Sequence, residues 1–235
     1  MFPEKRKDGS WIKKIVFNFP VPIDGEEVKE LPLETETTVD SVAMILSDGV
    51  GSGESAARDS GRIVDLTERI LDAGLGPDMA MLFLNGMAGA EGDENRMATL
   101  DLCRIDLYRG ECETVKAGGA AGFIKRSDRV EKIQSRQLPL GMSASEDISE
   151  KKWQLNSGDL VILVSDGVVQ NWPCGDGEYL LEQKIASLNV SSPVDLANLI
   201  LRYAIRQCGG KIRDDMTVLV TGIWKNEERE IEDIE

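Results

Sequence analysis

The spacing of apolar residues changes along the chain, and each change marks a boundary between a predicted group of strands and a predicted group of helices. Three short runs rich in Val, Ile and Leu predict strands, at residues 13–19, 27–32 and 41–47. From Glu54 the apolar residues recur three and four positions apart, which predicts an amphipathic helix ending around Gly74. Pro77 suits the first turn of a second helix, expected to reach Met87.

The second half of the chain is mostly strand-like. Short runs divided by turn residues predict strands at 97–107, 112–117, 122–126 and 130–134. Residues 151–155 and 159–164 are interpreted as a hairpin, and two helices are expected within 177–207 before a last strand at 216–224. This order predicts an α+β fold with mainly antiparallel sheets, in a single domain over 1–225. Residues 226–235 are expected to form a solvated acidic tail.

Composition and charge narrow the class of protein. Apolar residues make up 41% of the 235 residues and charged residues 29%, which is typical of a globular domain. No apolar run approaches the roughly 20 residues of a membrane span, and no signal core is present, so a cytosolic location is expected, or a tethered one if the chain is part of a longer protein. The net charge of −15 argues against nucleic acid or an anionic membrane surface as partner.

The absence of histidine removes several kinds of catalytic site. Cys/His zinc sites, Ser-His-Asp triads and histidine general bases are all excluded. The four cysteines show no CxxC spacing, and a disulfide framework is not expected in such a chain. Hydrolytic chemistry would therefore depend on carboxylates, lysines or a metal ion held by oxygen ligands.

The tetrapeptide SDGV occurs twice, at 47–50 and 165–168, each time directly after an apolar run. Each copy places an aspartate, Asp48 or Asp166, at the end of a buried strand. A third acidic element, Asp214 with Asp215, directly precedes the last strand. Carboxylates from distant parts of the chain suit hard divalent cations such as Mg²⁺ or Mn²⁺. A metal site is the chemistry that this spacing favours.

A series of motifs follows in family order: ILSDGVGSGESAARDSGRIVDLTERIL, TLDLCRIDL, KAGGAAGFIKR, LPLGM, GDLVILVSDGV and DDMTVLV. Together, over about 40–223, they resemble the metal-dependent protein phosphatases (the PPM family), in the branch of stage II sporulation protein E and the stress-response phosphatases. The resemblance implies a β-sandwich of two antiparallel sheets flanked by helix pairs. It also implies two Mn²⁺ or Mg²⁺ ions and hydrolysis of phosphoserine or phosphothreonine on a protein by a metal-activated water.

The same resemblance assigns roles to individual residues. Asp48 corresponds to the carboxylate that bridges the two metals, and Gly49 supplies a backbone carbonyl to the second. Asp166 and Asp214 resemble ligands of the first metal, while Asp215 stands beside a ligand and would orient it. The usual substrate in this branch is a small phosphorylated anti-sigma factor antagonist. The helix pairs of the branch resemble regulatory and dimerising elements, which makes a homodimer a candidate while the sequence leaves the oligomeric state open.

Two positions depart from the family pattern. Val50 occupies a position that holds a histidine in much of the wider family, so protonation of the leaving group falls to water or another group. The branch also carries a Gly-Asp-Ser/Thr element before the first SDG, which this chain lacks. Asp24 is the nearest candidate for that acidic group.

Two other functions compete with an active protein phosphatase. One is a catalytically weak pseudophosphatase that serves as a regulatory protein-binding module, which the irregular N-terminal motif favours. The other is a phosphatase acting on a phosphoester that is not a protein. Arg58 and Arg62, close to the first motif, are candidates for contact with a substrate phosphate, although a solvated helix face is the ordinary interpretation of both.

Overall fold

The computed structural model describes eleven segments of the chain. They are residues 15–18, 30–33, 41–51, 53–90, 98–107, 109–134, 137–142, 150–170, 172–173, 175–210 and 212–224. Two predictions, those for Asp24 and for the acidic tail 226–235, lie outside these residues.

Two antiparallel sheets form the centre of the fold. The six-stranded sheet has the order β2 (Glu30–Leu33), β1 (Ile15–Asn18), β10 (Val218–Gly222), β9 (Leu160–Val164), β6 (Gly122–Lys125), β7 (Val130–Ile133). The four-stranded sheet has the order β3 (Ser41–Leu46), β4 (Leu100–Asp106), β5 (Glu111–Ala117), β8 (Lys151–Gln154). Every strand pairing in both sheets is antiparallel.

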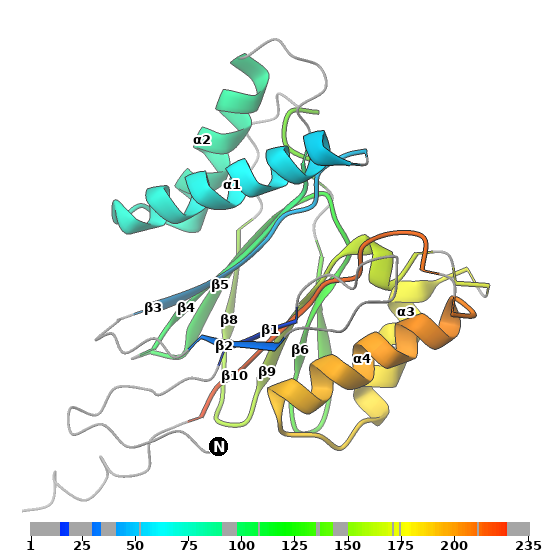
Figure 1. The fold of residues 1–235 in the computed structure, drawn as a ribbon. Coiled ribbons are helices and arrows are strands. Elements are labelled where there is room, and N and C mark those ends of the chain that lie inside the picture. Colours follow the sequence, from blue (N-terminus) through cyan, green and yellow to red (C-terminus); the bar gives the residue numbers. More distant parts are fainter. Residues whose placement is uncertain are drawn as a thin grey trace, which may run out of the picture.

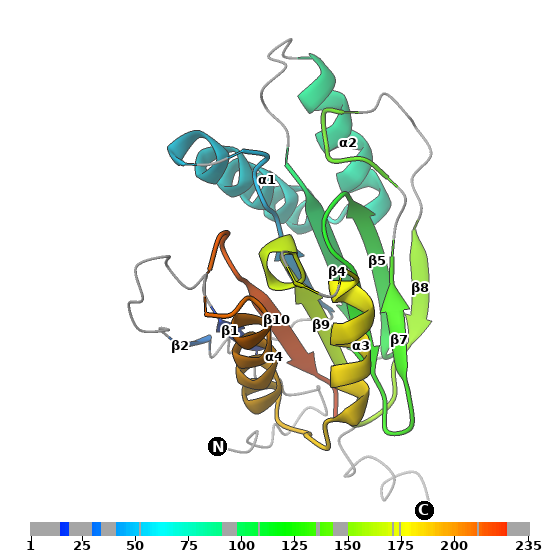
Figure 2. The same cartoon turned by 90° about the vertical axis from the view of Figure 1, so that its right-hand side faces the viewer.

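A pair of helices covers the outer face of each sheet (Figures 1 and 2). Helices α1 (Glu54–Asp72) and α2 (Pro77–Ala90) contact the four-stranded sheet. Helices α3 (Gly177–Ser187) and α4 (Pro193–Gln207) contact the six-stranded sheet. This four-layer arrangement confirms the predicted α+β sandwich flanked by helix pairs.

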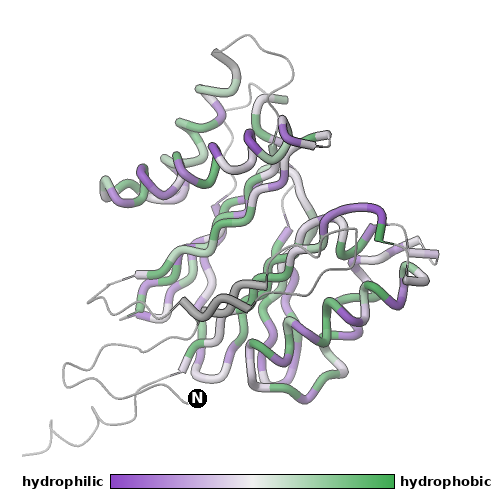
Figure 3. Tube along the Cα trace, viewed as in Figure 1, coloured by the Kyte–Doolittle hydropathy of each residue, from purple (hydrophilic) through white to green (hydrophobic). Residues whose placement is uncertain are grey.

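The alternation of side chains along each strand builds three separate apolar layers. The strands of both sheets are largely hydrophobic in Figure 3. In β4, Leu100 and Leu102 point to α1 and α2, whereas Cys103 and Ile105 point to the facing sheet. All five residues of β9 are buried because this central strand has an apolar layer on both sides. Its unbroken apolar run follows from that position.

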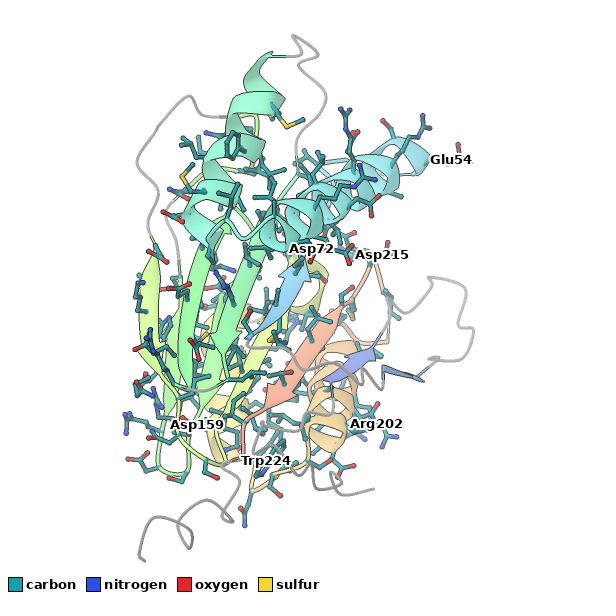
Figure 4. All side chains as sticks on the ribbon, turned by 90° about the vertical axis from the view of Figure 1, so that its left-hand side faces the viewer. Glu54, Asp72, Asp159, Arg202, Asp215 and Trp224 are labelled. Atoms are coloured by element: carbon teal, nitrogen blue, oxygen red, sulfur yellow. The ribbon has the colours of Figure 1, made fainter. Side chains whose placement is uncertain are left out.

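The hairpin predicted for 151–155 and 159–164 is wrong. β8 pairs with β5 in one sheet, and β9 pairs with β10 and β6 in the other. The connecting turn carries the chain between the sheets, and the buried Asp159 fixes it by accepting from Asn156 N at 2.8 Å and from Arg126 Nη1 at 2.5 Å. Arg126 Nε also donates to Glu131 Oε1 at 2.9 Å. Figure 4 places Asp159 and Trp224 at this end of the sandwich, far from Asp215.

A second buried ion pair lies between the sheets. Lys116 of β5 is paired with Asp101 of β4, directly opposite in the register, and both side chains are almost fully buried. Burial raises the pKa of Asp101 to about 6, despite the opposing effect of Lys116. Asp101 lies beneath Gly119, in the turn that takes the chain from β5 to β6 in the other sheet.

Helix α2 is apolar on more than the face it buries. Ala80, Met81 and Leu84 pack against the sheet, but Leu82, Phe83 and Met87 are 41%, 47% and 39% exposed. The helix has only 14 residues. No helix within the described segments combines the length and the hydropathy that a membrane span requires.

Candidate metal centre

The two SDG loops lie at the same end of the sandwich, one from each sheet. Asp48 follows β3, and Asp166 begins a single 3₁₀ turn (Asp166–Val168) after β9. Asp214 and Asp215 precede β10, the antiparallel neighbour of β9. The side chains of Asp48 and Asp166 interact with each other, and the negative charges of Asp214 and Asp215 also act on Asp48. The structure therefore brings together the four aspartates that were predicted to form a metal site. Figure 4 labels one of them, Asp215, at the end of the sandwich opposite Asp159 and Trp224.

The glycine of each SDG copy is required by a close backbone contact. A Cβ added to Gly49 would lie 2.1 Å from the carbonyl oxygen of Ala56, in the first turn of α1. A Cβ added to Gly167 would lie 2.2 Å from the carbonyl oxygen of Asp215. Only glycine, which has no Cβ, leaves room for a backbone this close. The two glycines therefore allow α1 and the 214–215 segment to pack against the aspartate loops.

The serine of each SDG copy anchors its loop by side-chain hydrogen bonds, a role that the sequence motifs did not reveal. Ser47 Oγ donates to the carbonyl oxygen of Thr99 at 2.7 Å, while Asp48 N donates to Thr99 Oγ1 at 3.0 Å. Ser165 Oγ donates to the carbonyl oxygen of Asp215 at 3.0 Å and accepts from Thr217 N at 2.9 Å. In both loops a threonine just before the neighbouring strand is linked to the SDG segment. In the sequence, each Ser-Asp-Gly has a matching threonine directly before an apolar strand, Thr99 or Thr217. That recurrence is the signal that could have predicted these hydrogen bonds.

Gln170 is a further residue of the site that sequence reasoning missed. It is exposed, lies four residues after Asp166, and donates from Nε2 to Asp166 Oδ2 at 2.5 Å. It also lines a cleft of about 500 Å³ beside Asp166, between the β5–β6 turn and the start of α3. The other carboxylates on this cleft are Asp176 and Glu178.

The carboxylates repel one another in the absence of a cation. Burial, and after it the charges of Asp166 and Asp214, raise the pKa of Asp48 to about 6. The pKa of Asp166 is also raised, mainly by burial and secondly by the charge of Asp214. Two neighbouring acids with raised pKa values are typical of functional sites rather than of ordinary surface carboxylates.

The donor set has the chemistry that Mn²⁺ or Mg²⁺ requires. All four side chains offer carboxylate oxygens, and Asp166 Oδ1 is buried with no hydrogen-bond partner. An ion would satisfy that oxygen and offset the repulsion. Within the described residues, however, no three acidic, histidine or cysteine side chains surround one common point. The assignment of Asp48, Gly49, Asp166 and Asp214 as ligands, and of Asp215 beside them, therefore stays a prediction.

The two arginines considered for phosphate contact both lie on α1. Arg62 lies in the crevice between α1 and α2, which Ile63, Leu84 and Met87 also line. Arg58 is exposed on α1. Neither is among the principal charges that shift the pKa of Asp48 or Asp166. A phosphate role for either arginine stays a prediction.

Comparison with known proteins gives consistent matches. The family model for Stage II sporulation protein E (SpoIIE) matches residues 38–223. Stage II sporulation protein E of Bacillus subtilis (strain 168) is 35% identical over 185 residues, which are 78% of this chain and 22% of that protein. Phosphoserine phosphatase RsbU of the same organism is 22% identical over 188 residues, 77% of this chain and 55% of that protein.

Solved structures agree with the sequence matches. The PP2C phosphatase domain of SpoIIE from Bacillus subtilis, with a fragment of its regulatory domain, superposes with a TM-score of 0.76 at 28% identity. The superposition covers 92% of this chain and 63% of that one. The chain spans only about a fifth of the length of the full Bacillus subtilis relative.

Asp48→Asn is expected to stabilise the metal-free protein. Asp48 has a pKa of about 6 in the folded state and near 3.8 when unfolded, so its ionisation above pH 6 opposes folding. Because this side chain is only half-buried, the gain is on the order of 1 kcal/mol, about 2–4 °C in Tm. Thermal melts in EDTA should show the difference from wild type growing between about pH 4 and 6 and staying constant above. A variant that is less stable than wild type at pH 7.5 would contradict the repulsion described above.

Gly167→Ala is expected to displace the 214–215 segment, since the new methyl group would collide with the Asp215 backbone. Such overpacking costs about 1–3 kcal/mol, and Mn²⁺ binding measured by calorimetry should weaken with it. Gly61→Ala is the matched control, because a Cβ at this helical position meets nothing within 4 Å. It should gain about 0.5–1 kcal/mol and leave binding unchanged. Equal behaviour of the two variants would show that the close contact at Gly167 is not needed.

Proposed function

The chain belongs to the stage II sporulation protein E family, and we propose that it is a metal-dependent serine/threonine protein phosphatase. The observation that carries the proposal is that Asp48 and Asp166 lie together. They come from different sheets, and the pKa of each carboxyl group is raised. Asp214 and Asp215 add to the same negative centre. The solved phosphatase domain of the SpoIIE relative supports the same assignment.

The proposed reaction needs no histidine, which the chain lacks. Two Mn²⁺ or Mg²⁺ ions, when bound, would supply a nucleophilic water at neutral pH and neutralise charge on the phosphoryl group. Asp48, Asp166 and Asp214 would hold the ions, with the Gly49 carbonyl as a further oxygen and Asp215 orienting its neighbour. Asp24 is our candidate for an additional acidic ligand. Val50, which is 48% exposed, cannot donate a proton, so water or another group would protonate the leaving serine or threonine.

The proposed substrate is a phosphorylated regulatory protein, of the kind represented by a small anti-sigma factor antagonist. One relative is named a phosphoserine phosphatase, RsbU. The cleft beside Asp166 is open and polar, and it is lined in part by backbone at Gly119 and Gly175. An extended polypeptide segment on either side of the phosphoresidue fits such a cleft better than a small apolar ligand does.

The proposal predicts Mn²⁺-dependent hydrolysis of p-nitrophenyl phosphate and of a phosphoserine protein. Asp166→Asn should lower kcat/KM at least about 100-fold, because it removes a charged ligand of the ions, while far-UV CD shows an intact fold. Two other outcomes would replace the proposal. Mn²⁺ binding by calorimetry without any hydrolysis would indicate a pseudophosphatase that serves as a protein-binding module. Hydrolysis of small phosphoesters alone would indicate a substrate that is not a protein.

We also propose that the chain forms a homodimer through α2. Leu82, Phe83 and Met87 expose an apolar surface on this helix that a second copy would cover. Exposed apolar surface of this kind, beside the polar face of α1, is typical of an interaction site. Among the described residues, Ala80, Met81 and Leu84 already fill the apolar layer between α2 and the sheet, so this surface is not part of that layer.

Phe83→Glu is expected to shift the protein from dimer to monomer in analytical ultracentrifugation. The new charge would be desolvated in the interface, which raises the dissociation constant by at least about tenfold. Tyr179→Glu, a similarly exposed aromatic residue on α3, is the matched control and should leave the sedimentation unchanged. A monomeric wild-type protein at 100 μM or so would end this part of the proposal.

A further inference from the structure

Gln170 is held in place by contacts of its own backbone. Its N–H donates to the carbonyl oxygen of Asp166 at 2.8 Å, and its carbonyl oxygen accepts from Cys208 Sγ at 3.8 Å. The turn is fastened further because Trp172 Nε1 donates to the carbonyl oxygen of Val168 at 3.0 Å. Residues four apart on one helical turn share a face, so the side chain of Gln170 is directed back to that of Asp166.

The contact between the two side chains has a defined polarity. An ionised carboxylate only accepts hydrogen bonds, so the amide nitrogen of Gln170, not its oxygen, must face Asp166 Oδ2. The other oxygen, Oδ1, is buried and has no hydrogen-bond partner. The hydrogen bond therefore distinguishes the two oxygens of the Asp166 carboxylate. Oδ2 accepts from the Gln170 amide, and Oδ1 keeps its electron pairs for a metal ion.

We propose that Gln170 is a positioning residue that fixes the rotation of the Asp166 carboxylate and presents Oδ1 to the metal ion. This inference rests on the proposed function, because it concerns the same metal centre. Partners that orient a ligand from behind commonly change metal affinity 10–100-fold when they are removed. Gln170 acts through Asp166 and touches no reacting atom.

A role in the cleft is the alternative for the same residue. Gln170 lines the cleft beside Asp166, so its amide is also within reach of a substrate segment. The two roles differ in what they change. A residue that orients Asp166 sets the affinity for Mn²⁺ in the absence of any substrate, whereas a residue that binds substrate sets KM at every Mn²⁺ concentration.

Gln170→Met is the direct test, since methionine keeps the length and helix propensity of glutamine but has no N–H to donate. Mn²⁺ titration of the metal-free full chain by calorimetry should give a dissociation constant at least tenfold above that of wild type. The EPR spectrum of bound Mn²⁺ should change as well. At saturating Mn²⁺, kcat for a phosphoserine protein should return to within about threefold of wild type, with KM unchanged.

Two controls separate positioning from a loss of structure. Gln183→Met makes the same chemical change at an exposed position of α3 and should bind Mn²⁺ like wild type. Gln170→Ala should repeat the loss of affinity, with a melting temperature in EDTA close to that of wild type. A dissociation constant for Gln170→Met within twofold of wild type would overturn the inference, and so would a KM defect that persists at saturating Mn²⁺. Failure of the wild-type chain to bind Mn²⁺ would instead overturn the proposed function.

Discussion

The repulsion between Asp48 and Asp166 is the constraint around which the rest of the molecule is arranged. Each carboxylate belongs to a different sheet, and the apolar layer between the sheets brings them into contact. Burial and like charge both oppose ionisation of the pair. The fold holds this unfavourable arrangement through backbone contacts that no other residue type permits, at Gly49 and Gly167, and through the paired hydrogen bonds of Ser47 and Ser165.

The two aspartate loops are built alike although they lie in different sheets. In each, an SDG segment follows a strand, its serine bonds to the segment before the neighbouring antiparallel strand, and its glycine admits another backbone. The two loops differ in the backbone segment that packs closely against the glycine. At Gly49 this segment is the first turn of α1, and at Gly167 it is the acidic segment 214–215. The first loop therefore joins the centre to a helix, and the second joins it to further carboxylates.

Local patterns in the sequence predicted most of the fold, because strand and helix periods are set by which face is buried. Ser41–Leu46 and Glu54–Asp72 agree closely with the predicted ranges. The hairpin predicted at 151–164 was wrong because membership of a sheet depends on distant partners, and the five-residue connection between β8 and β9 can equally pass from one sheet to the other. Asp48, Asp166 and Asp214 were recognisable from motif order. Gln170 was not, since an exposed glutamine carries no pattern, and its role follows only from the 2.5 Å contact that folding creates.

The fully paired Arg126, Glu131 and Asp159, at the end of the sandwich away from the carboxylates, have a consequence for how such proteins change in evolution. The charges at this end are paired, whereas the other end carries carboxylates that the metal-free fold would be more stable without. On the proposed function, a descendant that lost an aspartate of the centre would lose its chemistry, whereas the fold would be relieved of the repulsion at that position. Selection for binding alone would then meet no structural barrier, so non-catalytic descendants of this architecture should arise readily.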